Sequence, residues 1–199
     1  NKGVHTFGDL VLDDFKDKPK YRYRLQVTGA DISRGVLLIL PGDIAQYGMD
    51  PDQLDVAAAV RMSMSIPFIF EPVLLKDRAG KASYIVDGGL LSNFPVSIFD
   101  ADTADPPWPT FGYKLVDPDE SEPNDIRGPF TLLYALFATM MEAHDARYIA
   151  DADFVRTLPI PTLGVRATDF DLSRERSEEL YQSGRQAAEE FFATWDFER

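Results

Sequence analysis

The chain has 199 residues, a net charge of −13 and an apolar fraction of 45%, which is ordinary for a globular protein. This acidic balance argues against nucleic-acid binding and against electrostatic docking on anionic lipid, because phosphate contacts need clustered Lys and Arg. The absence of cysteine excludes disulfides and thiolate catalysis. No apolar run reaches transmembrane length and no signal peptide is visible, so we expect a cytoplasmic protein whose membrane contact, if any, is peripheral and apolar.

The first third of the chain is expected to form a β-hairpin. Tyr21–Val27 alternates apolar and polar side chains, which is typical of a half-buried strand. The apolar run Val36–Leu40 predicts a second strand, and Asp31–Gly35 predicts the turn between them. We expect Asp31 to be a turn or hydrogen-bonding residue rather than a catalytic one, because Asx turns favour this position.

A helix is expected from Asp50 to about Met64. Three consecutive alanines, 57–59, make it slim and suited to close packing. Ser63 and Ser65 lie at its end, where serine side chains satisfy free backbone groups. Both could also be read as nucleophiles, but no strained, glycine-flanked turn surrounds either of them.

The stretch from Ser83 to Val96 carries the strongest functional signal. Tyr84–Val86 predicts a buried strand that pairs with Val73–Leu75 across a polar hairpin loop. This strand ends on Asp87. A rigid element therefore delivers a carboxylate to the rim of a sheet, and in open α/β sheets functional groups gather at the carboxyl ends of strands.

Asp87 is followed by Gly88 and Gly89, which remove side chains that would crowd the carboxylate and permit a positive φ. Asn93 and Pro95 then offer a helix N-cap and a proline in the first helical turn. Asp-Gly between apolar runs is also a strong hairpin signal. The local pattern alone thus leaves two interpretations open, a plain turn residue and a catalytic aspartate.

The second half of the chain predicts further strands and two helices. Thr110–Val116 is expected to be a strand, and Phe154–Val165 an extended segment at an edge, because prolines interrupt it. Pro129–Tyr148 predicts a long helix whose apolar stripe fits either the wall of an acyl-chain pocket or ordinary core packing. A last helix is expected from Ser173 to about Trp195.

The order of these motifs resembles that of the patatin-like phospholipases. Asp87 with its two following glycines, Asn93 and Pro95 resembles the family's catalytic-aspartate motif. Ala58–Phe68 is similar to the family's alanine-rich helix that ends in a Ser-x-Ser-Ile-Pro turn, and Thr28–Gly35 resembles its strand, Asp and Gly turn. The resemblance is continuous over about the first half of the chain and continues more weakly through the last helix.

The resemblance implies an α/β fold, a patatin-like three-layer sandwich with a central mixed sheet between helices. The family's nucleophile is a serine in a Gly-x-Ser-x-Gly turn that precedes all of these motifs. No such pentapeptide occurs in the 199 residues. We therefore expect residues 1–199 to be the C-terminal part of a single patatin-like domain, with the N-terminal half of the same domain as its partner.

The resemblance further implies that the protein is a lipid acyl hydrolase, acting on phospholipids or other acyl lipids through a Ser–Asp dyad, without a cofactor or metal. Asp87 would be the catalytic base, and Gly88, Gly89, Asn93 and Pro95 would support it. No substrate-binding residue is assigned from the sequence. We expect this base to be partly desolvated, because an aspartate of ordinary pKa is a poor base for a serine.

The chain contains two histidines, His5 and His144. We expect both to be solvated or helix-terminal rather than catalytic, which agrees with a dyad that needs no histidine. The alternative to an enzyme is a non-catalytic patatin-like scaffold or lipid-binding domain that has lost its nucleophile. A Gly-x-Ser-x-Gly turn after a strand in the sequence preceding Asn1 would favour the enzyme, and its absence would favour the scaffold.

Overall fold

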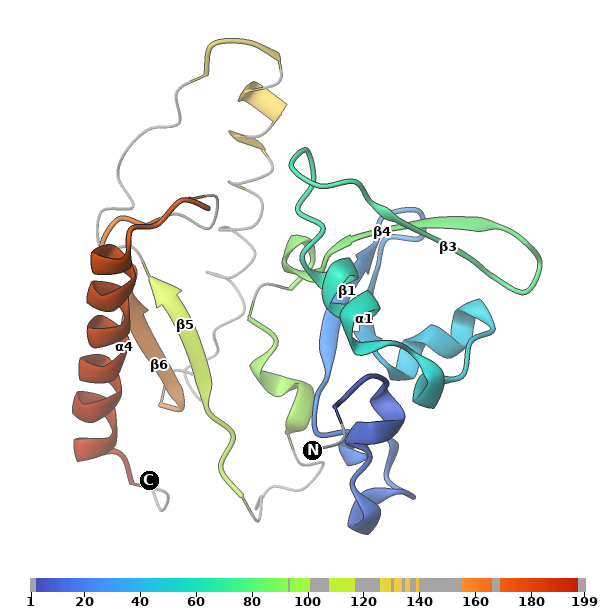
Figure 1. The fold of residues 1–199 in the computed structure, drawn as a ribbon, viewed down its shortest axis with the longest axis horizontal. Helices are drawn as coiled ribbons and strands as arrows, with labels where there is room; N and C mark the ends of the chain where they lie inside the picture. The colour runs from blue at the N-terminus through green and yellow to red at the C-terminus, as the bar shows by residue number, and fades with distance from the viewer. Residues whose placement is uncertain are drawn as a thin grey trace. The chain divides into compact units, whose positions relative to one another are not determined.

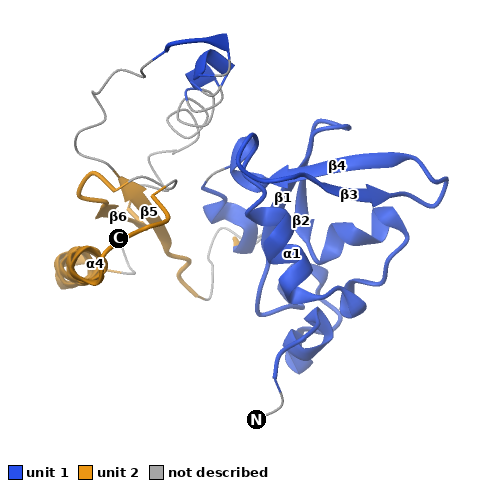
Figure 2. Ribbon diagram, turned by 45° about the horizontal axis from the view of Figure 1, so that its top comes forward, with its two compact units in different colours: residues 1–99, 126–148 blue, residues 100–125, 149–199 orange. Residues whose placement is uncertain are grey.

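The computed structural model places most of the chain in two compact units. The described residues are 3–92, 94–100, 108–116, 126–129, 131–133, 135–136, 139, 155–165 and 169–196. The first unit comprises residues 1–99 and 126–148, and the second comprises residues 100–125 and 149–199 (Figure 2).

Two β-hairpins make up the sheet of the first unit (Figure 1). One hairpin consists of β1 (Val27–Asp31) and β2 (Val36–Leu40), and the other of β3 (Val73–Lys76) and β4 (Ala82–Asp87). The strand order is β2-β1-β4-β3, and each neighbouring pair is antiparallel. The strand predicted at 36–40 and the hairpin predicted from 73 to 86 are confirmed.

The two hairpins join along β1 and β4. Gly29 lies opposite Asp87, and Asp31 lies opposite Ile85. Because the two strands are antiparallel, the beginning of β1 lies beside the end of β4. The first residues of β1 and the carboxylate of Asp87 therefore come together at one end of the sheet.

The helix α1 (Val56–Ser63) packs against β1 and β4. Its N-cap is Asp55, whose carboxylate accepts two backbone N–H groups of the first turn at 2.7 and 3.1 Å. Such a cap satisfies amides that have no acceptor within the helix. Ala59 and Met62 are fully buried, so one side of this short helix belongs to the core.

The core of the first unit lies between the sheet, α1 and the N-terminal segment. Phe7 and Tyr23 contact each other edge to face, with ring centroids 6.1 Å apart. Aromatic pairs prefer this geometry because the positive ring edge meets the negative ring face. The buried apolar side chains of this core are those of Phe7, Tyr23, Leu38, Leu40, Ile44, Tyr47, Leu54, Ala59, Met62 and Ile85.

Short 3-10 helices form much of the remaining first unit. They are η1 (Phe7–Leu10), η2 (Asp13–Phe15), η3 (Pro19–Tyr21), η4 (Gly42–Tyr47), η5 (Pro51–Gln53), η6 (Gly88–Leu90) and η7 (Val96–Phe99).

The strand predicted at Tyr21–Val27 is wrong, because β1 begins only at Val27. Tyr21 ends η3, and the first residue of that helix, Pro19, has no N–H to donate to a ladder. Tyr23 forms only an isolated bridge with the N-terminal segment, and its side chain is buried. The alternation of side chains thus reflects the burial of aromatic rings rather than a regular strand.

The helix predicted from Asp50 to Met64 is interrupted. Asp50 caps η5 by accepting a backbone N–H at 3.0 Å, and Asp55 caps α1. Because an N-cap residue has an extended backbone, two caps five residues apart begin two separate helices. The α-helix itself therefore starts at Val56.

The second unit contains a parallel strand pair, β5 (Gly112–Val116) and β6 (Thr157–Pro161), with α4 (Arg174–Thr194) packed on β6. Ser173 is the N-cap of α4, and Trp195 is its C-cap. The predicted last helix is confirmed at both ends. The α/β class is also confirmed, since antiparallel and parallel strands occur together with helices.

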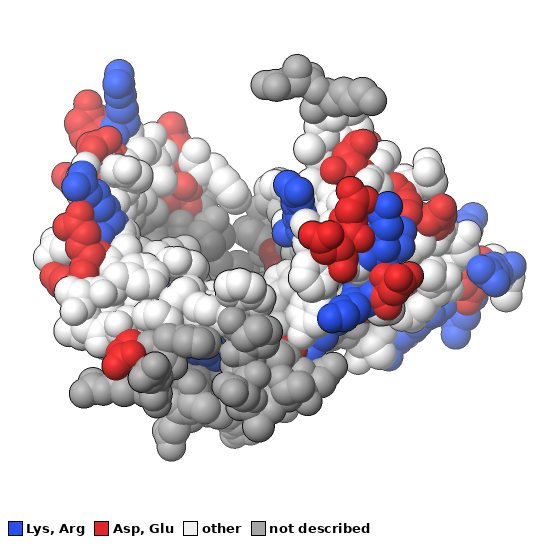
Figure 3. Space-filling model, turned by 90° about the horizontal axis from the view of Figure 1, so that it is seen from below, with Lys and Arg blue, Asp and Glu red and all other residues white. Residues whose placement is uncertain are grey.

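The helix predicted at 129–148, which includes His144, lies largely outside the described residues. Residues 129, 131–133, 135–136 and 139 of it are helical. Within the part of the chain that the structure describes, no helix is both long enough and apolar enough to cross a membrane. On the face drawn in Figure 3, Lys and Arg side chains lie among Asp and Glu side chains, and the described residues there form no continuous basic surface.

Candidate active site

Asp87 is the last residue of β4 and is held by backbone contacts on both sides. Its N–H donates to the carbonyl oxygen of Ser65 at 3.0 Å. Its carboxylate oxygen Oδ1 accepts the N–H of Gly89 at 2.8 Å, so Asp87 is the N-cap of η6. The strand, the neighbouring loop and the turn together give this carboxylate a defined position.

Gly88 lies very close to Thr28 of the neighbouring strand β1. A Cβ atom at position 88 would lie 2.4 Å from Oγ1 of Thr28 and 2.6 Å from its carbonyl carbon. The sequence predicts that Gly88 and Gly89 relieve crowding of the carboxylate and permit a positive φ. Gly88 instead begins the 3-10 helix without a left-handed φ, and it is required because β1 leaves no space for a side chain.

A cavity of about 380 Å³ opens beside Asp87. Ligand pockets in proteins typically measure about 300–1,000 Å³. Residues from β1, α1, the end of β4 and the following turn line it. They are Val27, Thr28, Val60, Ser63, Met64, Asp87, Gly89, Ser92 and Pro95.

The half-buried position of Asp87 changes its acidity. Burial raises the pKa of the carboxyl group, and the hydrogen bond from the Gly89 N–H opposes this shift without cancelling it. Desolvation disfavours the charged form, which makes the carboxylate a stronger base than an exposed aspartate. A group of this kind beside a cavity can accept a proton from a bound nucleophile.

The other predicted site residues fall into three groups. Gly89 and Pro95 line the same cavity as Asp87. Gly88 does not line the cavity and lies where a Cβ atom would collide with Thr28. Asn93 lies outside the described residues. Within the described part of the chain, no group of three or more His, Asp or Glu side chains could hold a metal ion.

The two serines considered as nucleophiles lie in different surroundings. Ser65 is fully buried, and its hydroxyl donates to the carbonyl of Arg61 at 2.6 Å and accepts from the Arg61 guanidinium. This is the helix-end role expected from the sequence. Ser63 is the last residue of α1 and lines the cavity.

Several cavity residues were not identified from the sequence. Val60 lies on the alanine-rich helix α1, which has a buried opposite side, and Met64 is its C-cap. Two large apolar residues four positions apart on the exposed side are the signal that could have revealed them. Thr28 and Ser92 carry no such signal, because only the pairing of β1 with β4 and the turn after Asp87 bring them to the cavity.

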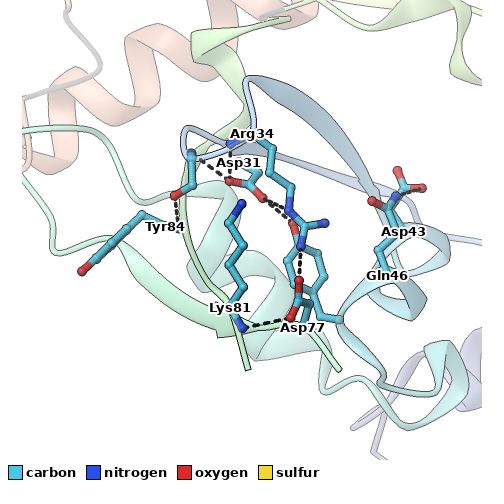
Figure 4. A network of polar contacts seen from close by, with 9 residues as sticks. Asp31, Arg34, Asp43, Gln46, Asp77, Lys81 and Tyr84 are labelled. Carbon is cyan, nitrogen blue, oxygen red and sulfur yellow. Dashed lines mark hydrogen bonds and ion pairs between the residues drawn. The ribbon is translucent and has the colours of Figure 1, made fainter. Parts of the chain in front are cut away.

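Asp31 lies in a network of hydrogen bonds that connects parts of the fold (Figure 4). It is fully buried and accepts the hydroxyl of Tyr47 at 2.7 Å and the N–H groups of Ser33 and Arg34 at 2.8 and 3.1 Å. Arg34 also donates to Asp77 in the β3–β4 loop at 2.9 Å. The predicted turn and hydrogen-bonding role of Asp31 is confirmed, and the network links the two hairpins.

The fold and this site define an α/β protein with a half-buried carboxylate at a strand end beside a ligand-sized cavity. Residues 5–100 match the family model described as patatin-like phospholipase. This segment, which contains Asp87 and every residue that lines the cavity, therefore belongs to the patatin-like phospholipase family.

The chain is also similar to a longer protein of Bacillus subtilis (strain 168), the uncharacterized protein YqhO. The two are 39% identical over 197 residues, which is 98% of this chain and 63% of that protein. The chain thus spans less than two thirds of the length of this relative.

Proposed function

We propose that the complete protein is a lipid acyl hydrolase that uses a Ser–Asp dyad, and that this chain is the C-terminal part of its domain and supplies the base, Asp87. One observation carries the proposal. Asp87 is a half-buried carboxylate with a raised pKa that lines a cavity of about 380 Å³, within the segment that matches the patatin-like phospholipases.

The proposed chemistry proceeds in two halves. As the serine Oγ attacks the ester carbonyl carbon, its proton passes to the Asp87 carboxylate, and the leaving alcohol then takes this proton from Asp87. In the second half, water attacks the acyl-serine and transfers a proton to Asp87, which returns it to the serine as the fatty acid departs. Each half consumes and regenerates one carboxylate, so a single fixed base is sufficient.

The nucleophile is proposed to lie in a Gly-x-Ser-x-Gly turn in the N-terminal half of the domain, together with the N–H groups that stabilise the oxyanion. Ser63 lines the cavity, but it ends a helix and no glycine flanks it. A serine is activated when a rigid turn aims it at both base and substrate. Ser63 lies at a helix end within the sequence Arg-Met-Ser-Met, which forms no such turn.

The alternative is a lipid-binding scaffold that has lost its nucleophile. A complete protein without a Gly-x-Ser-x-Gly turn after a strand in the sequence preceding Asn1 would favour it. In that case the cavity binds an acyl lipid, and Asp87 acts only as the cap of η6. Ester turnover by the complete protein, and its dependence on Asp87, separates the two functions.

The decisive experiment is Asp87→Asn in the complete protein. The amide is isosteric and still accepts the Gly89 N–H, but it cannot take the serine proton. Loss of a member of such a catalytic unit costs on the order of 10⁴-fold in rate.

The same substitution should not destabilise the fold. Because folding raises the pKa of Asp87, the buried carboxyl group favours the folded state only while it is protonated, and this contribution is lost as pH rises through the folded-state pKa. The melting temperature at neutral pH is therefore expected to stay the same or rise.

Asp50→Asn is the matched control. Asp50 also caps a 3-10 helix by accepting an N–H two residues on, at 3.0 Å, but it does not line the cavity. This variant should retain wild-type turnover of a lipid ester. Wild-type turnover in Asp87→Asn as well would reduce Asp87 to a turn residue and refute the proposal.

A further inference from the structure

An exposed apolar ridge formed by α1 and its C-cap residue is part of the cavity wall. The N–H of Met64 donates to the carbonyl of Val60 at 2.9 Å, so the two residues lie one helical turn apart with their side chains on the same side. Val60 is 42% exposed and Met64 is 47% exposed, and both line the cavity beside Asp87. We call these two side chains the α1 ridge.

Core packing does not account for the α1 ridge. The core-facing residues of this helix are Ala59 and Met62, which are 0% and 2% exposed. The ridge residues instead leave large apolar surfaces that no described residue of this chain covers. Single exposed apolar residues are common, but a pair that lines a ligand-sized cavity gains free energy when an apolar ligand covers it.

Apart from Val27, Gly89 and Pro95, the remaining cavity lining carries polar groups, unlike the α1 ridge. Thr28, Ser63 and Ser92 contribute hydroxyl groups, and Asp87 contributes the carboxylate. An ester substrate has the same two parts, an apolar acyl chain and a polar group at the reacting carbon. Because an apolar chain gains nothing from hydroxyl groups, it suits the apolar part of the lining, in which Val60 and Met64 are the exposed large side chains.

We propose that Val60 and Met64 bind the acyl chain of the substrate and make the enzyme selective for medium or long fatty acyl esters over acetyl esters. This inference rests on the proposed function, because it places the reacting ester carbon at Asp87. Each methylene group that leaves water for an apolar wall gains about fourfold in affinity. The flexible thioether of Met64 can adapt to chains of different length.

The test uses the complete protein and monomeric p-nitrophenyl acetate and octanoate. The double variant Val60→Thr/Met64→Gln keeps the shape of the α1 ridge and makes it polar. The ratio of kcat/KM for octanoate to that for acetate is expected to fall at least about tenfold, as if two methylene groups lost their apolar contact. An unchanged ratio would overturn the proposal.

Val36→Thr/Met49→Gln is the matched control. These residues are 40% and 39% exposed, close to the values of the α1 ridge, and neither lines the cavity. The substitutions introduce the same two polar groups on the same protein. The octanoate-to-acetate ratio should equal that of the wild type, and an equal fall in this control would assign the effect to general surface hydrophobicity and refute the proposal.

Binding of nonan-2-one, a ketone that cannot be hydrolysed, separates this inference from the proposed function. Calorimetric titration of the Asp87→Asn protein should give a Kd that rises about tenfold or more when the α1 ridge is made polar. Turnover that depends on Asp87, with ketone binding unaffected by the ridge substitutions, would refute the acyl site and leave the hydrolase intact. Ridge-dependent ketone binding without any turnover would refute the hydrolase and retain the acyl site.

Discussion

At Gly88, adding a single methyl group should lower the stability of the fold. In Gly88→Ala the new Cβ would lie 2.4–2.6 Å from atoms of Thr28, including a backbone carbon, so β1 and β4 must separate. Overpacking of this kind typically costs about 1–3 kcal/mol. The free energy of unfolding from a denaturant titration of the complete protein should fall by this amount, and ester turnover should fall with it.

Gly42→Ala is the control for Gly88→Ala. Gly42 has no heavy atom within 4 Å of its would-be Cβ and no left-handed φ. Its substitution should change the free energy of unfolding by no more than about 0.5 kcal/mol. Equal effects of the two substitutions would show that contact with Thr28 does not constrain position 88.

The raised pKa of Asp87 predicts how activity depends on pH. A base must be deprotonated to act, so kcat/KM should rise with pH through the pKa of Asp87 in the free enzyme. Because burial raises this pKa, the midpoint of the acid limb should lie above the ordinary aspartate value of about 3.9. A pH–rate profile of the complete protein measures it. A midpoint at or below the ordinary value would contradict a desolvated base.

At the scale of elements, the Asp31 network should determine how firmly the two hairpins hold together. Burial alone would raise the pKa of Asp31, but the hydrogen bonds from Tyr47 and from the Ser33 and Arg34 N–H groups outweigh it and lower that pKa. The carboxylate therefore stabilises the fold above the ordinary pKa, and this stabilisation is lost as pH falls through the lowered folded-state pKa.

Tyr47→Phe tests this network. The Tyr47 hydroxyl is held neutral, since burial and the bond to Asp31 raise its pKa to about 12. Without this donor a buried carboxylate loses a partner, which costs about 1–3 kcal/mol. Thermal denaturation as a function of pH should show lower stability and an acid transition at higher pH. Tyr84→Phe, at a residue that is 51% exposed, should change neither.

At the scale of the whole molecule, activity is expected to need more than this chain. The chain contains no Gly-x-Ser-x-Gly sequence, so Asp87 has no serine in a suitable turn to activate. Purified residues 1–199 should hydrolyse p-nitrophenyl butyrate no faster than buffer. Turnover by the isolated chain that is lost in Ser63→Ala would place the nucleophile in the cavity described here and overturn our assignment to a preceding segment.

The sequence alone was sufficient for the elements whose signals are local. The apolar run Val36–Leu40 forms a strand that buries Leu38 and Leu40, and α4 begins after Ser173 because this side chain accepts a backbone N–H of the first turn. The Asp-Gly-Gly sequence likewise indicated where β4 ends. Its assignment to a family depended on the ordered series of motifs before it, and the match over residues 5–100 supports that assignment.

Only the tertiary structure decided which residues share the cavity. Thr28 and Ser92 are 64 positions apart in numbering and reach the same space through the β1–β4 pairing and the turn at η6. The wrong prediction of a strand at Tyr21–Val27 has the same cause. Tyr23 is buried among polar neighbours because it contacts Phe7, a residue far away in the sequence, and not because it belongs to a strand. The local pattern of apolar and polar residues indicates whether a side chain is buried. Which partner buries it, and whether a carboxylate loses its water, depends on contacts between residues far apart in the chain.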